Sequence, residues 1–259
     1  MKHLKLFNDA VSYEAWKNSE DYVLPNVSYV EDNNIVYYNP GSGSSSDYVM
    51  VDLGLPSGLL WADRNVGAAS SEDAGLYFAW GDTVGYTAEQ VEKGEKTFNW
   101  SNCFDTTDGG SSFNKYATDK LTVLEATDDA AIVNMGSDWR IPTDTECEEL
   151  INNTIASFID IDGNEFSQSE AQSGAIAEYK LKGIKLTSKI NSNSIFIPAA
   201  GYYDEDMIDG ISMVGYLWSS SLNTSNSQEA RLMFFYHVGG LQVYNVDRYV
   251  GLSIRGVCN

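Results

Sequence analysis

Cysteine and histidine, the side chains that most often build cross-links, metal sites and nucleophilic centres, are scarce in this chain of 259 residues. An odd number of cysteines with no C-x-x-C pair argues against a disulfide framework; they are Cys103, Cys147 and Cys258. The two histidines, His3 and His237, lie far apart, so no Cys/His zinc pattern can be drawn. We therefore expect no metal and no cofactor.

Positive charge is also scarce. The chain has 16 Lys and Arg against 37 Asp and Glu, which gives a formal net charge of -21. Nucleic acids and anionic membrane surfaces both attract Lys and Arg, so we expect the chain to bind neither. The acidic residues are spread along the chain rather than gathered in a tail, which is typical of a surface that favours solubility.

Long hydrophobic runs are missing as well. The first residues, MKHLKLFNDAVSYEAW, contain no apolar signal core, and no stretch of about 18 apolar residues follows. We expect neither a secretory signal nor a membrane insertion. Tyrosine and glycine are abundant, at 16 and 22 residues, beside many serines and asparagines. This is the composition that adaptable binding surfaces favour.

The chain divides by composition into three parts. Residues 1–40 form a small N-terminal unit, with a helix expected in VSYEAWKNS and a hairpin in NVSYVEDNNIVYYNP. Residues 41–47, GSGSSSD, are a linker by composition. Residues 48–259 form the main domain. About 40 residues are marginal for independent folding, so we expect the first unit to serve attachment or oligomerisation.

The main domain combines few helices with many short strands. Helices are expected at SSEDAGLYFAWGD (70–82) and PTDTECEELINNT (142–154), both of which begin with capping residues. Strands are expected at 59–61, 178–188, 194–198 and 217–220, and in both halves of 230–257. This pattern predicts an α+β fold with irregular antiparallel sheets.

The segment ARLMFFYHVGGLQVYNVDRYVGLSIRGV (230–257) is apolar without the alternation of a half-buried strand. Either both faces of its strands are buried, or one face exposes large apolar side chains. We expect Leu232, Phe234, Ile254 and Val257 to be core. We expect an exposed binding face from Tyr236, His237, Tyr244, Val246, Asp247 and Val250.

Several motifs are interpreted as structural. The acidic DIDGNE segment (160–165) lacks the spacing of an EF-hand, so we expect a turn rather than a calcium site. Asp128 and Asp129 are expected to begin a helix. Arg140 is expected to pair with a carboxylate, and Pro142 to open a helix. Four tryptophans are expected to be core residues: Trp61, Trp80, Trp139 and Trp218.

Six blocks of sequence occur in a familiar order: YVMVDLGLPSGLLWADRNVGA, GLYFAWGD, DDAAIVNMGSDWRIPTDTECEELI, LTSKINSNSIFIPAAGYY, GYLWSSS and RYVGLSIRGV. Together they resemble the Fibrobacter succinogenes major paralogous domain family, over about residues 48–257. The resemblance implies a C-type lectin-like fold, related to that of formylglycine-generating enzymes. The N-terminal unit resembles the leader of phage and prophage structural proteins of Bacteroidetes.

Some lectin-fold proteins of this kind are targets of diversity-generating retroelements, which mutate adenines so that AAC codons scatter over many amino acids. The framework that the resemblance implies is kept here, at Arg248, Tyr249, Gly251, Ser253, Arg255 and Val257. Where relatives carry Asn, this chain has other residues reachable from AAC: Tyr236, His237, Gly239, Tyr244, Val246, Asp247 and Val250. A rim is expected at Ser221, Leu222 and Asn223.

The resemblance implies a non-enzymatic binding protein, a phage or prophage tail-associated adhesin with a diversified C-terminal face. Its partner would be a cell-surface protein or glycan, and a homotrimer would follow by analogy with tail fibres. It would be made in the cytoplasm and become part of the virion. The alternative is a bacterial surface module that binds glycans with fixed specificity. An enzyme of the formylglycine-generating type would need a reactive cysteine pair, which we cannot place.

Overall fold

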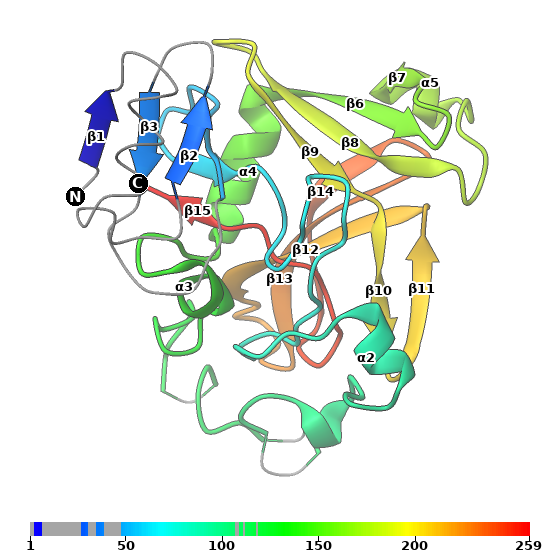
Figure 1. Cartoon of the computed structure of the whole chain (residues 1–259). Helices are drawn as coiled ribbons and strands as arrows, with labels where there is room; N and C mark the ends of the chain where they lie inside the picture. Colours follow the sequence, from blue (N-terminus) through cyan, green and yellow to red (C-terminus); the bar gives the residue numbers. More distant parts are fainter. Residues whose placement is uncertain are drawn as a thin grey trace.

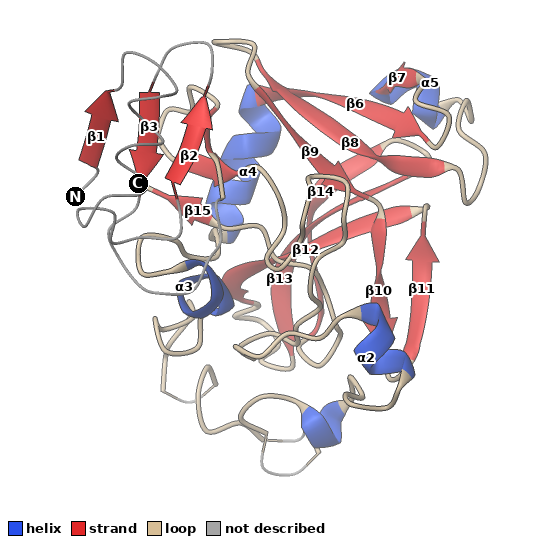
Figure 2. Cartoon of the chain, viewed as in Figure 1, coloured by secondary structure: helices blue, strands red, loops and turns tan. Residues whose placement is uncertain are grey.

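The computed structural model of the chain describes residues 3–6, 27–30, 35–38, 48–106, 109–110, 112–117 and 119–259. Strands and loops dominate, and the helices are few and short (Figure 2). The described strands form four sheets, and nearly all of the strand pairs are antiparallel. The α+β class predicted from the sequence is confirmed.

The N-terminal sheet contains the predicted hairpin. Its strands follow the order β1-β3-β2 and pair antiparallel, with bounds His3–Leu6, Ile35–Tyr38 and Val27–Val30. Val30 pairs with Ile35, so the two strands that flank the Asp-Asn-Asn sequence pair as predicted. The expected helix in VSYEAWKNS and the linker 41–47 lie outside the described residues.

A five-stranded sheet forms the C-terminal part of the main domain, in yellow to red in Figure 1. Its order is β11-β10-β12-β13-β14, and only the β10–β12 pair is parallel. The bounds are β10 Ala200–Asp204, β11 Met207–Ile211, β12 Val214–Leu222, β13 Glu229–Tyr236 and β14 Gly240–Asp247. The segment that lacks alternation therefore contains the hairpin β13–β14.

Two smaller sheets complete the domain. The four-stranded sheet has the order β7-β6-β8-β9, with bounds Glu165–Ser167, Thr154–Asp160, Leu181–Ser188 and Ser194–Pro198. The three-stranded sheet has the order β15-β5-β4, with bounds Val257–Cys258, Leu60–Ala62 and Met50–Asp52. Strand β9 has the predicted bounds, and β8 begins three residues later than predicted.

Helix α4, Asp144–Asn153, is the longest helix of the described residues, and its local sequence explains it. Thr143 and Glu146 form a capping box at its start, and Cys147 and Leu150 are buried on one face. Arg140 pairs with Glu146 at 2.5 Å, as predicted. The remaining helices are α2 Ala88–Glu92, η1 Trp100–Asn102, α3 Ala130–Met135 and α5 Gln168–Gln172. Asp129 caps α3, which confirms the expected helix start there.

The helix expected at 70–82 is wrong. Ser70 instead closes a turn, because both its backbone nitrogen and its hydroxyl donate to Asp73 Oδ2 at 2.9 Å. Gly75 follows with φ +75°, and a Cβ there would lie 2.3 Å from the carbonyl oxygen of Val66. The apolar residues that follow are extended and buried, and Phe78 bridges to Leu252.

The core has two main parts. The helix-side core packs α4 and the four-stranded sheet against one face of the five-stranded sheet; it includes Leu150, Phe158, Leu186, Leu217, Met233 and Phe235. The tryptophan core includes Trp80, Trp139, Trp218, Leu232, Val250 and Ile254. All four tryptophans expected as core residues are at most 2 % exposed. Within the described part of the chain no helix has the length and apolar character needed to cross a membrane.

Candidate ligand-binding face

The register of the hairpin β13–β14 explains the unbroken apolar run. Met233 and Phe235 lie in the helix-side core, and their pairing partners Val243 and Leu241 pack against it too. Leu232 and Phe234 belong to the opposite face, because successive side chains of a strand point to opposite sides. Leu232 is buried in the tryptophan core, whereas Phe234 is only half-buried. Both faces carry large apolar residues, but on β13 only the helix-side face, with Met233 and Phe235, is fully buried.

Five aromatic rings lie together on the incompletely covered face. We call them the aromatic face: Tyr202, Tyr216, Phe234, Tyr236 and Tyr244. Tyr202 stacks on Tyr216 with centroids 5.1 Å apart, and Tyr216 meets Phe234 edge-on at 5.6 Å. Phe234 lies 5.8 Å from both Tyr236 and Tyr244. These distances are typical of favourable aromatic pairs, so the rings support one another in fixed positions.

Four strands bring the rings together. The parallel pairing of Gly201 with Gly215 places Tyr202 beside Tyr216. Tyr216 then pairs directly with Phe234 across β12 and β13. Tyr244, on β14, lies diagonally opposite Phe234 and is 57 % exposed. The sheet therefore presents a row of rings that runs across its strands rather than along one of them.

Acidic residues lie near the Tyr202 end of this row. We call Asp204, Asp209 and Asp247 the acidic rim; the first two are exposed and the third is half-buried. The Tyr202 hydroxyl donates to Asp209 Oδ2 at 3.1 Å, and burial together with this bond raises the pKa of Tyr202 to about 12. Burial, followed by the charges of Glu229 and Asp204, raises the pKa of Asp247. Protonated tyrosines and carboxylates thus supply hydrogen-bond donors and acceptors around the rings.

The predicted site residues separate into two groups. Tyr244 is exposed, and four others are half-buried: Tyr236, His237, Val246 and Asp247. The backbone nitrogen of His237 donates to Met213 O at 2.8 Å, which fixes the start of the β13–β14 turn. Val246 packs partly against the tryptophan core. The structure thus brings Tyr236 and Tyr244 together on the aromatic face and places the other three around the same hairpin.

Two of the predicted site residues are buried, so the expectation of exposure is wrong for them. Val250 is 3 % exposed and belongs to the tryptophan core. Gly239 has φ +78°, and a Cβ there would lie 2.6 Å from Gln168 O at the start of α5. Phe234 differs in the other direction: it was expected in the core and is instead half-buried among the rings.

The predicted rim is mostly buried too. Ser221 and Leu222 are 6 % and 8 % exposed, and only Asn223 is half-buried. Ser221 Oγ donates to Asp144 Oδ1 at 3.1 Å, which ties the end of β12 to α4. All three residues line a separate cavity of about 400 Å³ together with Thr122, Val123, Asp144, Thr224, Ser225 and Arg231. They are not part of the aromatic face.

The framework residues near the C-terminus are structural. The guanidinium of Arg255 is fully buried and donates to Asn65 Oδ1, Ala62 O and Phe196 O at 2.9 to 3.0 Å. Arg248, also buried, lies over the ring of Phe113 with 4.0 Å to its centroid. Burial lowers the pKa of both arginines, to about 9 and about 10. These side chains hold together the loops that they contact.

Sequence reasoning missed Tyr202 and Tyr216 of this site, and it placed the half-buried Phe234 in the core. Each tyrosine lies within two residues of another aromatic residue, in GYY and GYLW, so the pattern gives no indication of which ring faces outward. The two tyrosines meet because β10 pairs in parallel with β12. Nothing in the sequence indicates that these two segments are neighbours. The acidic run DED after Tyr203 was the one local indication of an exposed edge.

The described residues offer little for metal or thiol chemistry. They contain no cluster of three or more His, Cys, Asp or Glu that could hold a metal ion. All three cysteines are buried and none is in a disulfide, and burial raises the pKa of Cys103 to about 12 and that of Cys147 further still. A raised thiol pKa makes the nucleophilic thiolate scarce at neutral pH. The DIDGNE segment forms the expected turn, in which Asp160 Oδ1 accepts from the backbone of Asp162 and Asn164.

The row of rings, the acidic rim and the fixed hairpin together describe a surface suited to contact with a ligand. They do not describe a pocket for a reacting group. Comparison of the chain with protein-family models, with curated proteins and with solved structures gives no match in any of the three.

Proposed function

We propose that the chain is a non-enzymatic ligand-binding protein whose aromatic face contacts a receptor on a cell surface. One observation carries the proposal: five rings in a connected row, one exposed and four half-buried, lie on one face of a sheet whose other face packs against the helix-side core. An exposed cluster of large apolar side chains with a polar edge is characteristic of interaction sites. Rigid aromatic side chains supply contact area at a small entropic cost.

The main domain is, in this proposal, a C-type lectin-like domain, and its β13–β14 hairpin is the diversified segment. The accessible positions Tyr236, His237, Tyr244, Val246 and Asp247 support this, because they cluster on one hairpin. Substitutions there would change the surface and leave the buried framework intact. Gly239 and Val250 are excluded from the diversified set, because the fold requires a glycine and a buried apolar side chain at those positions.

The biological setting that fits is a phage or prophage tail-associated adhesin. The receptor is a protein or a glycan of the host cell surface, and the N-terminal unit attaches the domain to the virion. Several copies on one particle would raise the avidity, so a modest affinity at each face would suffice.

The test is a binding screen with a matched control. The double variant Tyr216→Ser/Tyr244→Ser removes two rings of the aromatic face, whereas Tyr179→Ser removes a tyrosine that is 59 % exposed elsewhere. Both variants and the wild type are applied to a printed glycan array and to an array of bacterial surface proteins. We expect the double variant to lose at least about tenfold in affinity for any wild-type hit, as hot-spot residues do. Unchanged binding by the double variant would refute a role for the face.

A further inference from the structure

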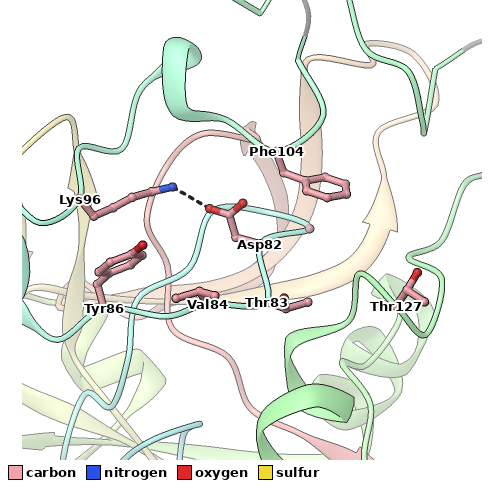
Figure 3. A pocket seen from close by; sticks show the side chains of 8 residues that line it. Asp82, Thr83, Val84, Tyr86, Lys96, Phe104 and Thr127 are labelled. Carbon is pink, nitrogen blue, oxygen red and sulfur yellow. Dashed lines mark hydrogen bonds and ion pairs between the residues drawn. The ribbon is translucent and has the colours of Figure 1, made fainter.

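A second concave site lies on the loop that follows Trp80, and it shares no residue with the aromatic face. The cavity has a volume of about 240 Å³ and is shown in Figure 3. Eight residues line it: Gly81, Asp82, Thr83, Val84, Tyr86, Lys96, Phe104 and Thr127. Their side chains include a carboxylate, an ammonium group, three hydroxyls and two aromatic rings.

An ion pair stands on one side of this cavity. Lys96 Nζ lies 2.8 Å from Asp82 Oδ2, and the two side chains are only 11 % and 18 % exposed. The ammonium also donates to Asn102 O at 3.1 Å, so one of its three protons remains available. Among the described residues no hydrogen bond reaches Asp82 Oδ1. The pair therefore keeps one free acceptor and one free donor side by side.

Because the pair is partly buried, a hydrogen bond to its free acceptor or free donor would stabilise a bound ligand more than the same bond at an exposed site. Burial raises the pKa of Asp82, and the charge of Lys96 opposes that rise. A hydrogen bond to a partly desolvated carboxylate is stronger than one made in open water. A ligand that supplies the missing partners would be favoured over the few waters that fit the same space.

Aromatic rings form the walls. Figure 3 shows Phe104 on one side of Asp82 and Tyr86 near Lys96. Gly81 has φ +89°, and a Cβ there would lie 2.5 Å from the Phe104 ring, so the glycine allows the ring to close over the loop. The loop is also anchored from below, because Asn134 Nδ2 donates to Thr83 O at 2.9 Å. The cavity is thus built from fixed parts.

We propose that this cavity binds a single neutral saccharide unit through two adjacent hydroxyl groups. One hydroxyl donates to Asp82 Oδ1, its neighbour accepts from Lys96 Nζ, and the apolar face of the sugar ring lies against Phe104 or Tyr86. The charges of the pair cancel, which favours a neutral polar ligand over an ion. The volume is below the roughly 300 Å³ at which drug-sized sites begin, which suits one sugar ring rather than a longer chain.

Charged ligands fit this cavity less well. A cation at Asp82 Oδ1 would lie beside the Lys96 ammonium, and an anion at Lys96 Nζ would lie beside the Asp82 carboxylate. Either would be repelled by a like charge, because the two groups are only 2.8 Å apart and largely shielded from solvent. A vicinal diol uses the free acceptor and the free donor and leaves the pair intact.

The experiment is saturation-transfer NMR with the full chain and with glucose, galactose, mannose and N-acetylglucosamine as separate probes. We expect signals from at least one sugar with the wild type. Asp82→Asn and Phe104→Ala should weaken its binding about tenfold or more, since each removes one of the two contacts. Glu165→Gln is the matched control, because it alters an exposed pair with Lys185 at 3.1 Å and should change nothing.

Phe104→Ala can perturb the fold, so the location is tested independently by soaking wild-type crystals in the sugar that binds. Density between Asp82 and Phe104 is expected. The proposal is overturned if none of the four sugars gives a signal, or if the signal survives Asp82→Asn. It is also overturned if Tyr244→Ser abolishes the signal and Asp82→Asn does not, because the sugar would then occupy the aromatic face. Displacement of the sugar by acetate or methylammonium would assign the cavity to ions instead.

Discussion

Phe234 and Phe235 are neighbours on β13, yet they lie in opposite environments. Phe235 is 1 % exposed and belongs to the helix-side core, where its ring lies against Gly215; a Cβ on that glycine would be 2.2 Å from it. Phe234 is half-buried and touches only rings of the aromatic face among its aromatic partners. The same side chain stabilises the fold at one position and forms surface at the next.

The difference shows that the role of a strand residue depends more on the elements that pack over it than on its residue type. Helix α4 and the four-stranded sheet bury one face of β12 and β13, at Leu217, Met233 and Phe235, and cover Leu241 and Val243 of β14 in part. The tryptophan core buries the other face fully at Ala230 and Leu232, whereas Tyr216 and Phe234 pack against it only in part. A protein under selection for stability alone would place polar residues beyond that point. In this chain the five residues of the aromatic face occupy that region instead.

The largest expected effect comes from truncating the two phenylalanines separately. Phe235→Ala should lower the free energy of unfolding by about 3 to 5 kcal/mol, because it opens a cavity in packed core. Phe234→Ala should cost only about 1 to 2 kcal/mol, because its ring is already partly in water. Urea unfolding of both variants measures the two values. Equal losses would mean that the two faces are equally buried and that the aromatic face is core.

A smaller effect is expected at the turn of the hairpin. Gly239→Ala should destabilise the chain by about 2 kcal/mol or more, because it combines the strain of a positive φ with a clash against the start of α5. Gly163→Ala is the matched control: Gly163 has φ +85° but nothing lies within 4 Å of an added Cβ. It should show the strain alone, about 1 kcal/mol. Thermal melts of both variants check this, and a tolerant Gly239 would return that position to the diversified set.

The smallest effect concerns the acidic rim. Burial and neighbouring charges raise the pKa of Asp247, so the folded chain binds a proton there more readily than the unfolded chain does. Its contribution to stability is therefore highest at low pH and is lost as the pH rises through the folded pKa. Asp247→Asn should be more stable than the wild type at pH 7, by less than about 1 kcal/mol because the side chain is partly solvated.

That gain from Asp247→Asn should shrink as the pH falls towards 4, near the ordinary value for an aspartate. Unfolding curves at several pH values measure it, and Asp206→Asn on the exposed β10–β11 turn is the control. A gain that is the same at every pH would mean that the fold does not disfavour the charged form of Asp247.

Local signals in the sequence predicted the parts of the fold that local chemistry controls. The capping box of α4 and the hairpin around Val30 and Ile35 were predicted correctly, as were the buried tryptophans. The helix expected at 70–82 failed because a Ser-Asp turn and the close approach at Gly75 are tertiary requirements. A pattern of apolar residues cannot distinguish a buried extended segment from a helix.

The candidate site was predictable only in part, and for a similar reason. The exposed Tyr244 followed from the expectation that the hairpin is a surface, but Val250 lies just beyond the hairpin, where the chain turns back into the core. Tyr202 and Tyr216 join the site through the pairing of β10 with β12, which no residue pattern specifies. To predict which side chains of distant strands meet in the site, the order of the strands in the sheet must be known.

The measurement that tests the central claim most directly is to sequence the gene and its flanking DNA from many sister isolates. The account predicts that variation concentrates at the codons for Tyr236, His237, Tyr244, Val246 and Asp247. Those for Gly239 and Val250 should stay constant, and a near-copy with adenines at the varied sites should lie nearby. Constant codons across the hairpin and no template would contradict diversification. The aromatic face would then be a binding surface of fixed specificity.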